Sequence, residues 1–410
     1  MRIAIAGETY YPGSNGQAAF TIRLAEGLAG AGHHVMVIVP SDRLATYTQE
    51  INGVLVQKMA GMNWTRFHPE MYVTLPNPGM GRILDKFKPD VVHVQDHYII
   101  SHLVVWAARR RCLPALGTNH FLPDNLYPYL NLLPLPLSFK RYVLWKLMLD
   151  VYNLLDAATA PTETAAQILR EQAIHIPVTA ISNGIDTHTF YPDPGVDRAA
   201  MRRKYGLDPQ RALILYIGRI DGEKRLEVLL NAVHRCGRKD FQLAIAGRGA
   251  HLAHLRNLAH HLRVEDQAVF TGYIPAEDKP ALINSADIFA MPSKAELQSI
   301  ATLEAMATAK PVLAANARAL PELVKHGLNG YLFKPDDVED ATRWMDQLLD
   351  DPAAWERMGQ ASLALVQPHS LDNTIRQYGD LYRSLVEARA VEKVSARRKT
   401  GKNKDRLIDL

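Results

Sequence analysis

The sequence predicts an α/β protein made of two doubly wound domains that follow one another along the chain. Its 410 residues are more than a single hydrophobic core ordinarily serves. Short, continuous apolar runs alternate with stretches long enough for a helix, which is the pattern of parallel strands covered by helices on both faces. The pattern is interrupted near residue 183 and then begins again, which predicts a second sheet of the same kind.

Each domain is expected to contain six strands, recognised by runs of Val, Ile, Leu and Ala. In the first domain these runs are RIAIAG, HHVMVIVP, VVHVQD, PALGTNH, AATAPT and VTAISNG. In the second domain they are ALILYIGRI, FQLAIAGRG, QAVFTGYI, DIFAMPS, PVLAAN and GYLFKP. In open α/β sheets the ligand lies beyond the carboxyl ends of the strands, so the loops after these runs are the expected binding loops.

The segment 183–197 is rich in Pro, Gly and Asp, and it is the candidate linker between the domains. Two such domains facing each other would enclose a cleft. We expect a first domain at 1–190, a second at 191–370, a helix at 371–390 that returns to the first domain, and a disordered basic tail at 391–410.

The composition is typical of a globular cytoplasmic protein, with 47% hydrophobic and 22% charged residues. Cys112 and Cys236 are the only cysteines, too few for a disulfide framework or a cysteine zinc site. The first residues lack the long apolar region of a secretory signal. No uncharged apolar run reaches the 18 residues that a membrane span needs, so we expect a cytoplasmic location.

The formal net charge is +4, and much of the excess lies in the tail. Two interpretations stay open for that tail: a solubilising end, or a segment that docks on acidic lipid. A nucleic-acid-binding protein would also account for the charge. It would not account for the motifs in the loops after the strands, so no nucleic-acid partner is expected.

Two glutamates, Glu296 and Glu304, stand eight positions apart around small residues. A helix from about Ser299 would place Glu296 in the preceding loop and Glu304 in the second turn, with a rise of about 12 Å over eight residues. That length is close to the distance between the hexose and the ribose of a nucleotide sugar. The alternative is that both are ordinary solvated side chains, as most glutamates are.

The second domain opens with YIGRIDGEKRLEVLL, in which Gly218 ends a strand and Arg219 and Lys224 flank a turn before a helix. Two cations at a helix N-terminus suit a diphosphate, because the point charges and the helix dipole both favour anions there. Arg and Lys in loops are more often solvated, so this motif alone leaves the function open.

Together these motifs resemble the signature of the retaining glycosyltransferases of family 4, which have the GT-B fold. That signature pairs G-R-x(4)-K, here Gly218, Arg219 and Lys224, with E-x(7)-E, here Glu296 and Glu304. The resemblance covers nearly all of the chain, from YYPGSNGQAAF through SNGIDTHTF to ELVKHGLNGYLF. It implies two Rossmann-like domains facing across a cleft and a nucleotide diphosphate sugar as donor.

The resemblance also implies roles for individual residues of the second domain. Glu296 is expected to contact the hydroxyls of the donor hexose, and Glu304 to accept from the ribose hydroxyls. The backbone amides of Gln298 and Ser299 are expected to meet the sugar and phosphate. Further family positions are matched by Arg248 and Ile274 beside the nucleotide base, and by Asn183 in the loop between the domains.

In the first domain the resemblance assigns two positions. Gly16 ends the loop PGSNG and would present its amide to the donor diphosphate, although the segment also suits an ordinary strand-to-helix turn. His120 follows a strand, and the family pattern places it near the sugar 6-hydroxyl and the reacting centre. A lone histidine is more often structural, so the resemblance alone gives it a catalytic role.

The sequence departs from the commonest family pattern after the first glutamate. Many relatives have E-x-F-G, whereas this chain has Glu296, Leu297, Gln298 and Ser299. The glutamine resembles the T-E-T-Q-G form of transferases that glycosylate diacylglycerol. Ser299 stands where a glycine is usual, and Asn15 replaces the first glycine of the N-terminal loop.

No D-x-D triad follows a strand, so neither a metal site nor a cofactor is expected. Arg219, Lys224 and the helix N-terminus would instead stabilise the charge that develops on the leaving diphosphate. Retention, which the resemblance implies, would proceed by attack from the same face. The acceptor hydroxyl would then give its proton to the departing phosphate.

The acceptor is expected to contact the first domain. Segment 121–155 is rich in Leu, Tyr and Pro and carries Lys140, Arg141, Trp145 and Lys146. That mixture suits a segment at a membrane interface with anionic lipid, and it equally suits a buried helix with some surface cations. With Gln298, it favours transfer of a hexose from UDP- or GDP-hexose to a lipid such as diacylglycerol, by a protein peripheral to the cytoplasmic face of the membrane.

Other functions remain as alternatives. The same site could serve a soluble sugar or polysaccharide-precursor acceptor, and a nucleotide-sugar epimerase can have the same two-domain build. The resemblance at Glu296 and Glu304 argues against the epimerase. A nicotinamide oxidoreductase needs G-x-G-x-x-G after the first strand, and GETYYPGSNG does not supply it.

Overall fold

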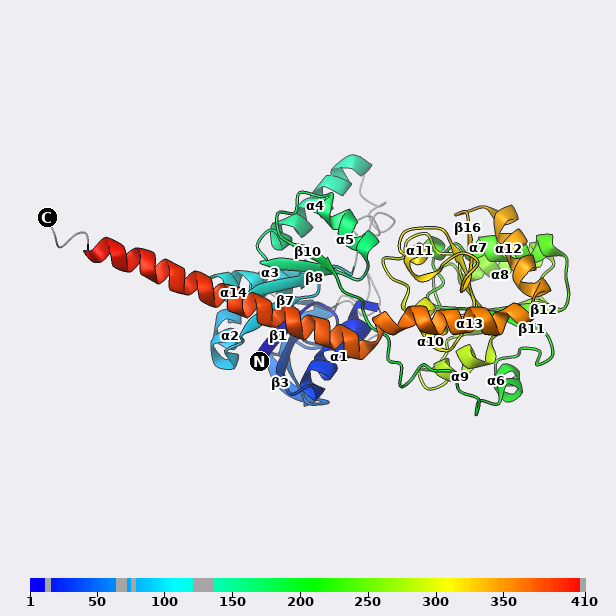
Figure 1. Cartoon of the computed structure of the whole chain (residues 1–410), viewed down its shortest axis with the longest axis horizontal. Coiled ribbons are helices and arrows are strands. Elements are labelled where there is room, and N and C mark those ends of the chain that lie inside the picture. Colours follow the sequence, from blue (N-terminus) through cyan, green and yellow to red (C-terminus); the bar gives the residue numbers. More distant parts are fainter. Residues whose placement is uncertain (12–15, 64–71, 75–78, 121–135, 406–410) are drawn as a thin grey trace. The chain divides into compact units, whose positions relative to one another are not determined.

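The computed structural model describes residues 1–11, 16–63, 72–74, 79–120 and 136–405, and the chain forms two compact units. The first unit comprises Met1–Ser182 and Asp372–Leu410, and the second comprises Asn183–Leu371. Each is built on a parallel sheet with helices packed against it (Figure 1), which confirms the predicted fold class. The division falls at Asn183, at the start of the predicted linker rather than at residue 190.

The sheet of the first unit has eight strands in the order β10-β9-β8-β7-β1-β2-β4-β3. All neighbours are parallel except β3 and β4, which are antiparallel. A short ribbon of β5 and β6 is separate. The strands are β1 Arg2–Ala6, β2 His34–Pro40, β3 Tyr47–Ile51, β4 Val54–Met59, β5 Gly61–Asn63, β6 Tyr72–Thr74, β7 Val91–Val94, β8 Ala115–Thr118, β9 Ala157–Ala160 and β10 Val178–Ala180.

The helices of this unit cover the sheet because each buries an apolar stripe against it. Helix α1 contributes Phe20, Leu24 and Leu28 to a core that also contains Tyr378 and Tyr382 of the last helix. The two helices touch at Gly27, where a Cβ atom would lie 2.1 Å from Ile375 Cδ1. The helices are α1 Gly16–Gly30, α2 Met80–Phe87, α3 Ile99–Arg109, α4 Leu137–Tyr152, α5 Glu163–Arg170 and α14 Leu371–Asp405.

The last helix corrects the prediction of a disordered tail. Helix α14 continues to Asp405, so residues 391–405 are helical, and 406–410 lie outside the described residues. The physical reason is that this stretch contains no proline and is rich in Lys and Arg, which favour helices. Net charge alone was a poor guide to its backbone conformation.

The second unit has a six-stranded sheet in the order β13-β12-β11-β14-β15-β16, with every pair parallel. This is the doubly wound Rossmann order, in which the direction of winding changes between the first and fourth strands, here β11 and β14. The strands are β11 Ala212–Ile217, β12 Phe241–Ala246, β13 Ala268–Gly272, β14 Ile288–Met291, β15 Val312–Ala315 and β16 Gly330–Phe333.

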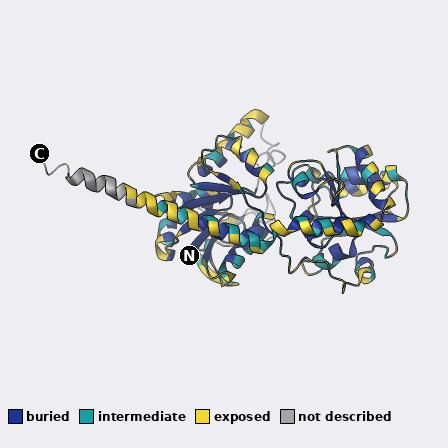
Figure 2. Ribbon diagram, in the orientation of Figure 1, coloured by how far each residue is buried: buried dark blue, intermediate teal, exposed yellow. Residues whose placement is uncertain are grey.

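The strands of both sheets are mainly buried (Figure 2), as the continuous apolar runs predicted. Every residue of β12, β14 and β15 is buried, without the alternation of a one-sided sheet. The helices of the second unit are α6 Arg198–Lys204, α7 Leu226–Cys236, α8 Leu252–Leu262, α9 Lys279–Ser285, α10 Ile300–Ala307, α11 Leu320–Leu323, α12 Val338–Asp350 and α13 Ala353–Val366, with 3₁₀ turns η2 Gly222–Lys224 and η3 Gln367–His369.

The described part of the chain contains no helix that is both long and apolar enough to cross a bilayer.

Candidate active site

Most of the predicted site residues lie in the second unit, in loops at the carboxyl ends of its strands. Gly218 follows β11, Arg248 follows β12 and Glu296 follows β14. These three strands are neighbours at the centre of the sheet, with β11 between the other two. This is the edge at which doubly wound sheets bind ligands.

The loop from Gly218 to Lys224 is held against the loop after β12 by backbone contacts. A Cβ atom on Gly247 would lie 1.8 Å from the carbonyl oxygen of Gly218, so only glycine fits, and its φ of +144° is one that other residues rarely adopt. The hydroxyl of Tyr216 donates to the carbonyl of Arg219 at 2.6 Å. The loop therefore has a defined course before α7 begins.

Lys224 and Glu296, 72 positions apart in the sequence, form an ion pair. Lys224 Nζ lies 2.6 Å from Glu296 Oε1, and the two side chains are only 16% and 11% exposed. Poorly hydrated charges need a partner, because removing them from water is costly. The residues assigned to the leaving diphosphate and to the donor hexose are thus in direct contact.

Arg219 has a more open environment than Lys224. Its guanidinium pairs with Asp221 at 2.6 Å and with Glu223 at 3.0 Å, and its side chain is 55% exposed. Exposed ion pairs of this kind are weak, so the guanidinium can exchange partners at little cost. An anionic ligand at this edge could therefore recruit Arg219 more easily than Lys224.

Ser299 caps helix α10, which explains why it replaces the glycine of the common pattern. Its hydroxyl oxygen accepts hydrogen bonds from the amide of Thr302 at 3.3 Å and from the Thr302 hydroxyl at 2.8 Å. The predicted helix start is confirmed, since α10 begins at Ile300 with Glu296 in the loop before it.

The side chain of Gln298 binds the other predicted loop of this unit. Its Oε1 accepts a hydrogen bond from the backbone amide of Asn183 at 2.9 Å, and both residues are buried. The structure therefore joins two predicted site residues. It also gives Gln298 a positioning role for residues 183–184 that the sequence did not reveal.

Glu304 lies in the second turn of α10, as predicted, and its side chain is only 1% exposed. It forms an ion pair with Lys279, the first residue of α9. Lys279 Nζ also lies 5.8 Å from the centre of the Phe190 ring. Lys279 is a candidate site residue that sequence reasoning missed; its only signal was a lysine at the start of a helix near the strand edge.

Arg248 and Ile274, assigned to the nucleotide base, follow neighbouring strands. Ile274 is buried, and the guanidinium of Arg248 lies 5.1 Å from the centre of the Tyr273 ring. The Tyr273 ring is exposed. An exposed aromatic ring beside an arginine offers a flat surface for a base, and the tyrosine is a second residue that the sequence analysis missed.

His120 lies in the first unit, directly after β8, and is half-buried. Its Nε2 donates to Gln95 Oε1 at 2.9 Å, and its ring centre is 4.6 Å from that of Phe20. Burial lowers the pKa of His120 to about 3, so the imidazole is neutral at physiological pH. It can exchange hydrogen bonds with a ligand but does not supply a positive charge.

A buried polar network supports His120 from the sheet side. Gln95 Nε2 lies 3.2 Å from the ring nitrogens of His93, whose Nε2 bonds to the Thr118 hydroxyl and whose Nδ1 bonds to the Tyr382 hydroxyl, both at 2.7 Å. Burial also lowers the pKa of His93 to about 3. The last helix thus helps to position the predicted catalytic histidine.

Gly16 begins α1 and is exposed, with no heavy atom within 4 Å of a Cβ atom built on it. The remainder of the predicted glycine-rich loop, 12–15, which includes Asn15, lies outside the described residues. Gly16 and His120 belong to the first unit, and all the other predicted site residues belong to the second.

A carboxyl pair at the carboxyl edge of the first sheet was not predicted. Asp96, after β7, accepts from the amide of Glu8 at 2.7 Å and from the Gln17 side chain at 3.0 Å. Glu8, after β1, accepts from the amide of Ile100 at 2.9 Å. Burial, with the charge of Asp96 as a lesser cause, raises the pKa of Glu8 to about 8, so Glu8 retains its proton at neutral pH.

Helix α4 lies within segment 121–155, which was predicted to suit a membrane interface, so the exposure of its side chains bears on that prediction. Trp145 is buried, so it does not contribute to a membrane interface as its place in the predicted segment suggested; the indole packs inside the unit. The helix nevertheless exposes apolar and basic side chains, and residues 121–135 lie outside the described residues. The exposed apolar, aromatic and basic side chains of α4 are Leu137, Phe139, Arg141, Tyr142, Lys146 and Leu147; Ser138 and Asp150 are also exposed, and Asp150 pairs with Lys146.

Two doubly wound units, the second with lysine–glutamate ion pairs at its strand edge, have the architecture that the resemblance to GT-B glycosyltransferases implies. Two family models match the chain: glycosyl transferases group 1 over residues 197–364, and glycosyltransferase family 4 over residues 14–189. The chain therefore belongs to the family 4 (group 1) glycosyltransferases.

Curated relatives span most of the chain at moderate identity. It is 26% identical over 369 residues to the GDP-mannose-dependent alpha-mannosyltransferase of Corynebacterium glutamicum, covering 87% of this chain and 84% of that one. It is 24% identical over 340 residues to the alpha-monoglucosyldiacylglycerol synthase of Streptococcus pneumoniae, covering 81% and 75%.

Solved structures are similar in fold. HepE of Anabaena, crystallised with UDP, has a TM-score of 0.76 at 17% identity, covering 94% of this chain and 100% of that one. Sucrose-phosphate synthase of Thermosynechococcus elongatus has a TM-score of 0.75 at 20% identity, covering 95% and 100%. At these identities the likeness concerns the GT-B fold.

Proposed function

We propose that this chain transfers a hexose, with retention of configuration, from UDP- or GDP-hexose to a membrane lipid acceptor such as diacylglycerol. The observation that carries the proposal is the pair of ion pairs at the strand edge of the second unit, Lys224 with Glu296 and Lys279 with Glu304. In each pair, a glutamate carboxylate that could accept hydrogen bonds from sugar hydroxyls contacts a lysine cation. A nucleotide diphosphate sugar offers hydroxyls to the carboxylates and a diphosphate to the cations.

Lys224 and Arg219 would stabilise the charge on the diphosphate as it leaves. In the proposed step the bond from the anomeric carbon to the diphosphate oxygen breaks, and a bond to the acceptor oxygen forms on the same face. The acceptor hydroxyl gives its proton to the departing phosphate. Fixed cations lower the barrier because they are already oriented before charge develops. The chemistry needs no metal, since these two side chains supply the positive charge.

The remaining residues position the donor. Glu304 accepts from the ribose hydroxyls, Arg248 and Ile274 line the base, and Glu296 accepts from hydroxyls of the hexose. In the first unit, neutral His120 offers its imidazole to the sugar 6-hydroxyl, and Gly16 offers its amide to the diphosphate. An imidazole without charge suits this role, because a cation beside the reacting carbon would oppose the positive charge that develops there.

Three observations support a lipid acceptor. Helix α4 exposes Phe139 and Leu147 together with Arg141 and Lys146, a combination that suits anionic lipid headgroups. Gln298 matches the form found in transferases that glycosylate diacylglycerol. The relative from Streptococcus pneumoniae is itself a glucosyldiacylglycerol synthase by name. We accordingly propose a peripheral position on the cytoplasmic face of the membrane.

A soluble sugar acceptor is the second candidate. It is favoured by the fold likeness to sucrose-phosphate synthase, a protein whose name contains a soluble sugar phosphate. The donor site would be the same in both cases. Only the residues of the first unit that meet the acceptor would differ.

The test is a transfer assay with radiolabelled UDP-glucose or GDP-mannose as donor, diacylglycerol in phosphatidylglycerol vesicles and a soluble sugar as alternative acceptors, and excess EDTA. Label from one donor should appear in the organic phase, and EDTA should not prevent it. Label that appears only in an aqueous product with a soluble sugar would favour the second candidate. Transfer that depends on added magnesium or manganese would contradict the proposed metal-independent step.

A further inference from the structure

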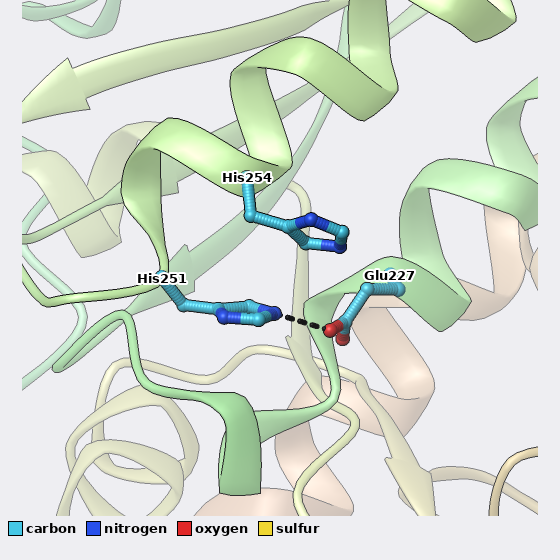
Figure 3. Close-up of side chains that lie close together, drawn as sticks. All are labelled: Glu227, His251 and His254. Atoms are coloured by element: carbon cyan, nitrogen blue, oxygen red, sulfur yellow. Dashed lines mark hydrogen bonds and ion pairs between the residues drawn. The ribbon is translucent and has the colours of Figure 1, made fainter.

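Three potential metal ligands converge in the second unit behind the loop that carries Arg219 and Lys224. His251 immediately precedes α8, His254 lies three residues further on the same face, and Glu227 is in the first turn of α7. One ligand atom of each lies within 4.8 Å of the others. Figure 3 shows the carboxylate of Glu227 directed toward the imidazole of His251, with the ring of His254 beside it.

The cluster leaves one carboxylate oxygen without a hydrogen bond. Glu227 Oε1 lies 2.6 Å from His251 Nε2, whereas Glu227 Oε2 is buried and has no hydrogen-bond partner among the residues that the structure describes. A buried acceptor without a donor is unfavourable, and native proteins seldom leave one unexplained. The ring centres of His251 and His254 are 4.5 Å apart. An imidazole nitrogen of His254 therefore lies near the Glu227 carboxylate as a second potential nitrogen ligand.

We propose that Glu227, His251 and His254 bind a divalent transition-metal ion, with zinc as the expected one. Two imidazoles and a carboxylate are ligands that zinc prefers, at bond lengths of about 2.0 to 2.2 Å. Ligand atoms around a tetrahedral ion stand about 3.3 Å apart by those bond lengths. The contact between His251 and Glu227 would therefore open slightly, and His254, which is exposed, would move in by side-chain rotation.

The position of the site gives the ion a structural role. The amide of His251 donates to the carbonyl of Ile220 at 3.0 Å, and its ring borders Gly222 at 4.0 Å from a Cβ atom built there. Glu227 lies in the first turn of α7, the helix that follows Lys224. An ion that joins α7 to α8 would thus fasten the loop 218–224 at its back. None of its three ligands is assigned to the donor, so the proposal does not rest on the proposed function.

Cobalt(II) titration of the full chain tests the site directly, because tetrahedral cobalt absorbs in the visible and zinc displaces it. One ion per chain should bind, and zinc should bleach the absorption. His254→Ala and Glu227→Gln should each weaken binding by about tenfold or more, since even residues that only support a ligand give losses of 10- to 100-fold. His260→Ala is the matched control, because His260 is also exposed on α8 and bonds to Glu265.

A second readout does not depend on activity or on colour. Zinc at 100 times its dissociation constant should raise the Tm of the second unit by about 5 to 10 °C, and it should slow hydrogen exchange of the amides at 220–225. At the same zinc concentration both effects should fall to about half or less in His254→Ala and persist in His260→Ala. Equal cobalt affinity in all three variants, or zinc that leaves the Tm and the exchange rates unchanged, would overturn the proposal.

Discussion

In the second unit the buried carboxylates face lysines, whereas in the first unit the buried carboxyl group of Glu8 faces another carboxyl group. Glu296 and Glu304 are paired with Lys224 and Lys279. Glu8, in contrast, lies beside Asp96 and keeps its proton. Polar groups at the two strand edges are thus stabilised in different ways: by opposite charge in one unit and by neutrality in the other.

The difference has a chemical consequence. Ion pairs at the edge of the second unit can exchange partners with a ligand that carries both hydroxyls and phosphates, as a nucleotide sugar does. The edge of the first unit has a neutral histidine, His120, and a protonated glutamic acid, Glu8. Such groups donate and accept hydrogen bonds without attracting a strongly charged ligand, which suits an uncharged acceptor hydroxyl.

The largest expected effect comes from breaking the buried pair. Lys279→Met should lower the free energy of unfolding of the second unit by about 3 to 5 kcal/mol, because it leaves the Glu304 charge buried without its cation. The double variant Lys279→Met with Glu304→Gln should recover much of that loss. The measurement is guanidinium-induced unfolding of both variants. A double variant no more stable than Lys279→Met alone would show that charge pairing is not the cause.

The next largest effect concerns Glu8 in the first unit, where a carboxyl group is stabilised by keeping its proton rather than by an ion pair. Because burial raises the pKa of Glu8 from 4.5 to about 8, the folded state holds a proton that the unfolded state releases. The free energy of unfolding should therefore fall as pH rises from about 4.5 to 8, by a few kcal/mol at most. Glu8→Gln should flatten this slope, and Glu50→Gln, an exposed glutamate of the same unit, should retain it. Parallel slopes in all three proteins would refute the protonated state of Glu8.

The third prediction concerns the rate of sugar transfer by variants of the second unit. Lys224→Ala should lower kcat/KM by about ten- to a hundredfold, since a charge-assisted contact is worth about 1.5 to 3 kcal/mol. Arg219→Ala should cost less than Lys224→Ala, because its guanidinium is more exposed. Lys294→Ala is the control, a half-exposed lysine that pairs with Asp336. Comparable losses at Lys224 and Lys294 would remove the special role of Lys224.

The smallest effect concerns the exposed face of α4. Arg141→Gln should weaken sedimentation with phosphatidylglycerol vesicles by about fivefold at low salt, because one cation near an anionic surface contributes about 1 kcal/mol. The difference should shrink as salt screens the charge. Arg203→Gln, an exposed arginine of the second unit, should sediment like the unmodified chain. Equal sedimentation of both variants would exclude α4 as a membrane contact.

Periodicity was sufficient to predict the fold. Continuous apolar runs such as RIAIAG and FQLAIAG became buried parallel strands, because only strands covered on both faces can be apolar at every position. The helix after Glu296 was predictable from its small residues and its Ser299 cap. The helical course of 391–405 was missed, because charge density was given more weight than helix propensity.

The site was predictable only in part, because side-chain partners distant in sequence leave no local pattern. The sequence motifs identified Lys224 and Glu296 as candidate site residues. They did not reveal that these two side chains, 72 positions apart in the sequence, are in contact. Lys279, Tyr273 and the pair of Glu8 and Asp96 belong to no short motif, so only the fold brings them to the strand edges. Trp145 was named as a candidate membrane residue but is buried. The apolar and basic composition of its segment does not reveal which side chains point into the core.

The most direct test of the central claim is calorimetric titration of UDP and GDP into the chain and two variants. If Lys224 releases Glu296 and contacts the phosphates of the donor instead, one of the two nucleotides should bind at a single site per chain. Lys224→Ala should then weaken binding by about tenfold or more, as expected for loss of a charge-assisted contact to phosphate. Glu296→Gln should leave the affinity unchanged or raise it, because it frees Lys224 from its internal partner. Absence of binding of either nucleotide, or a loss of the same size in both variants, would contradict the account.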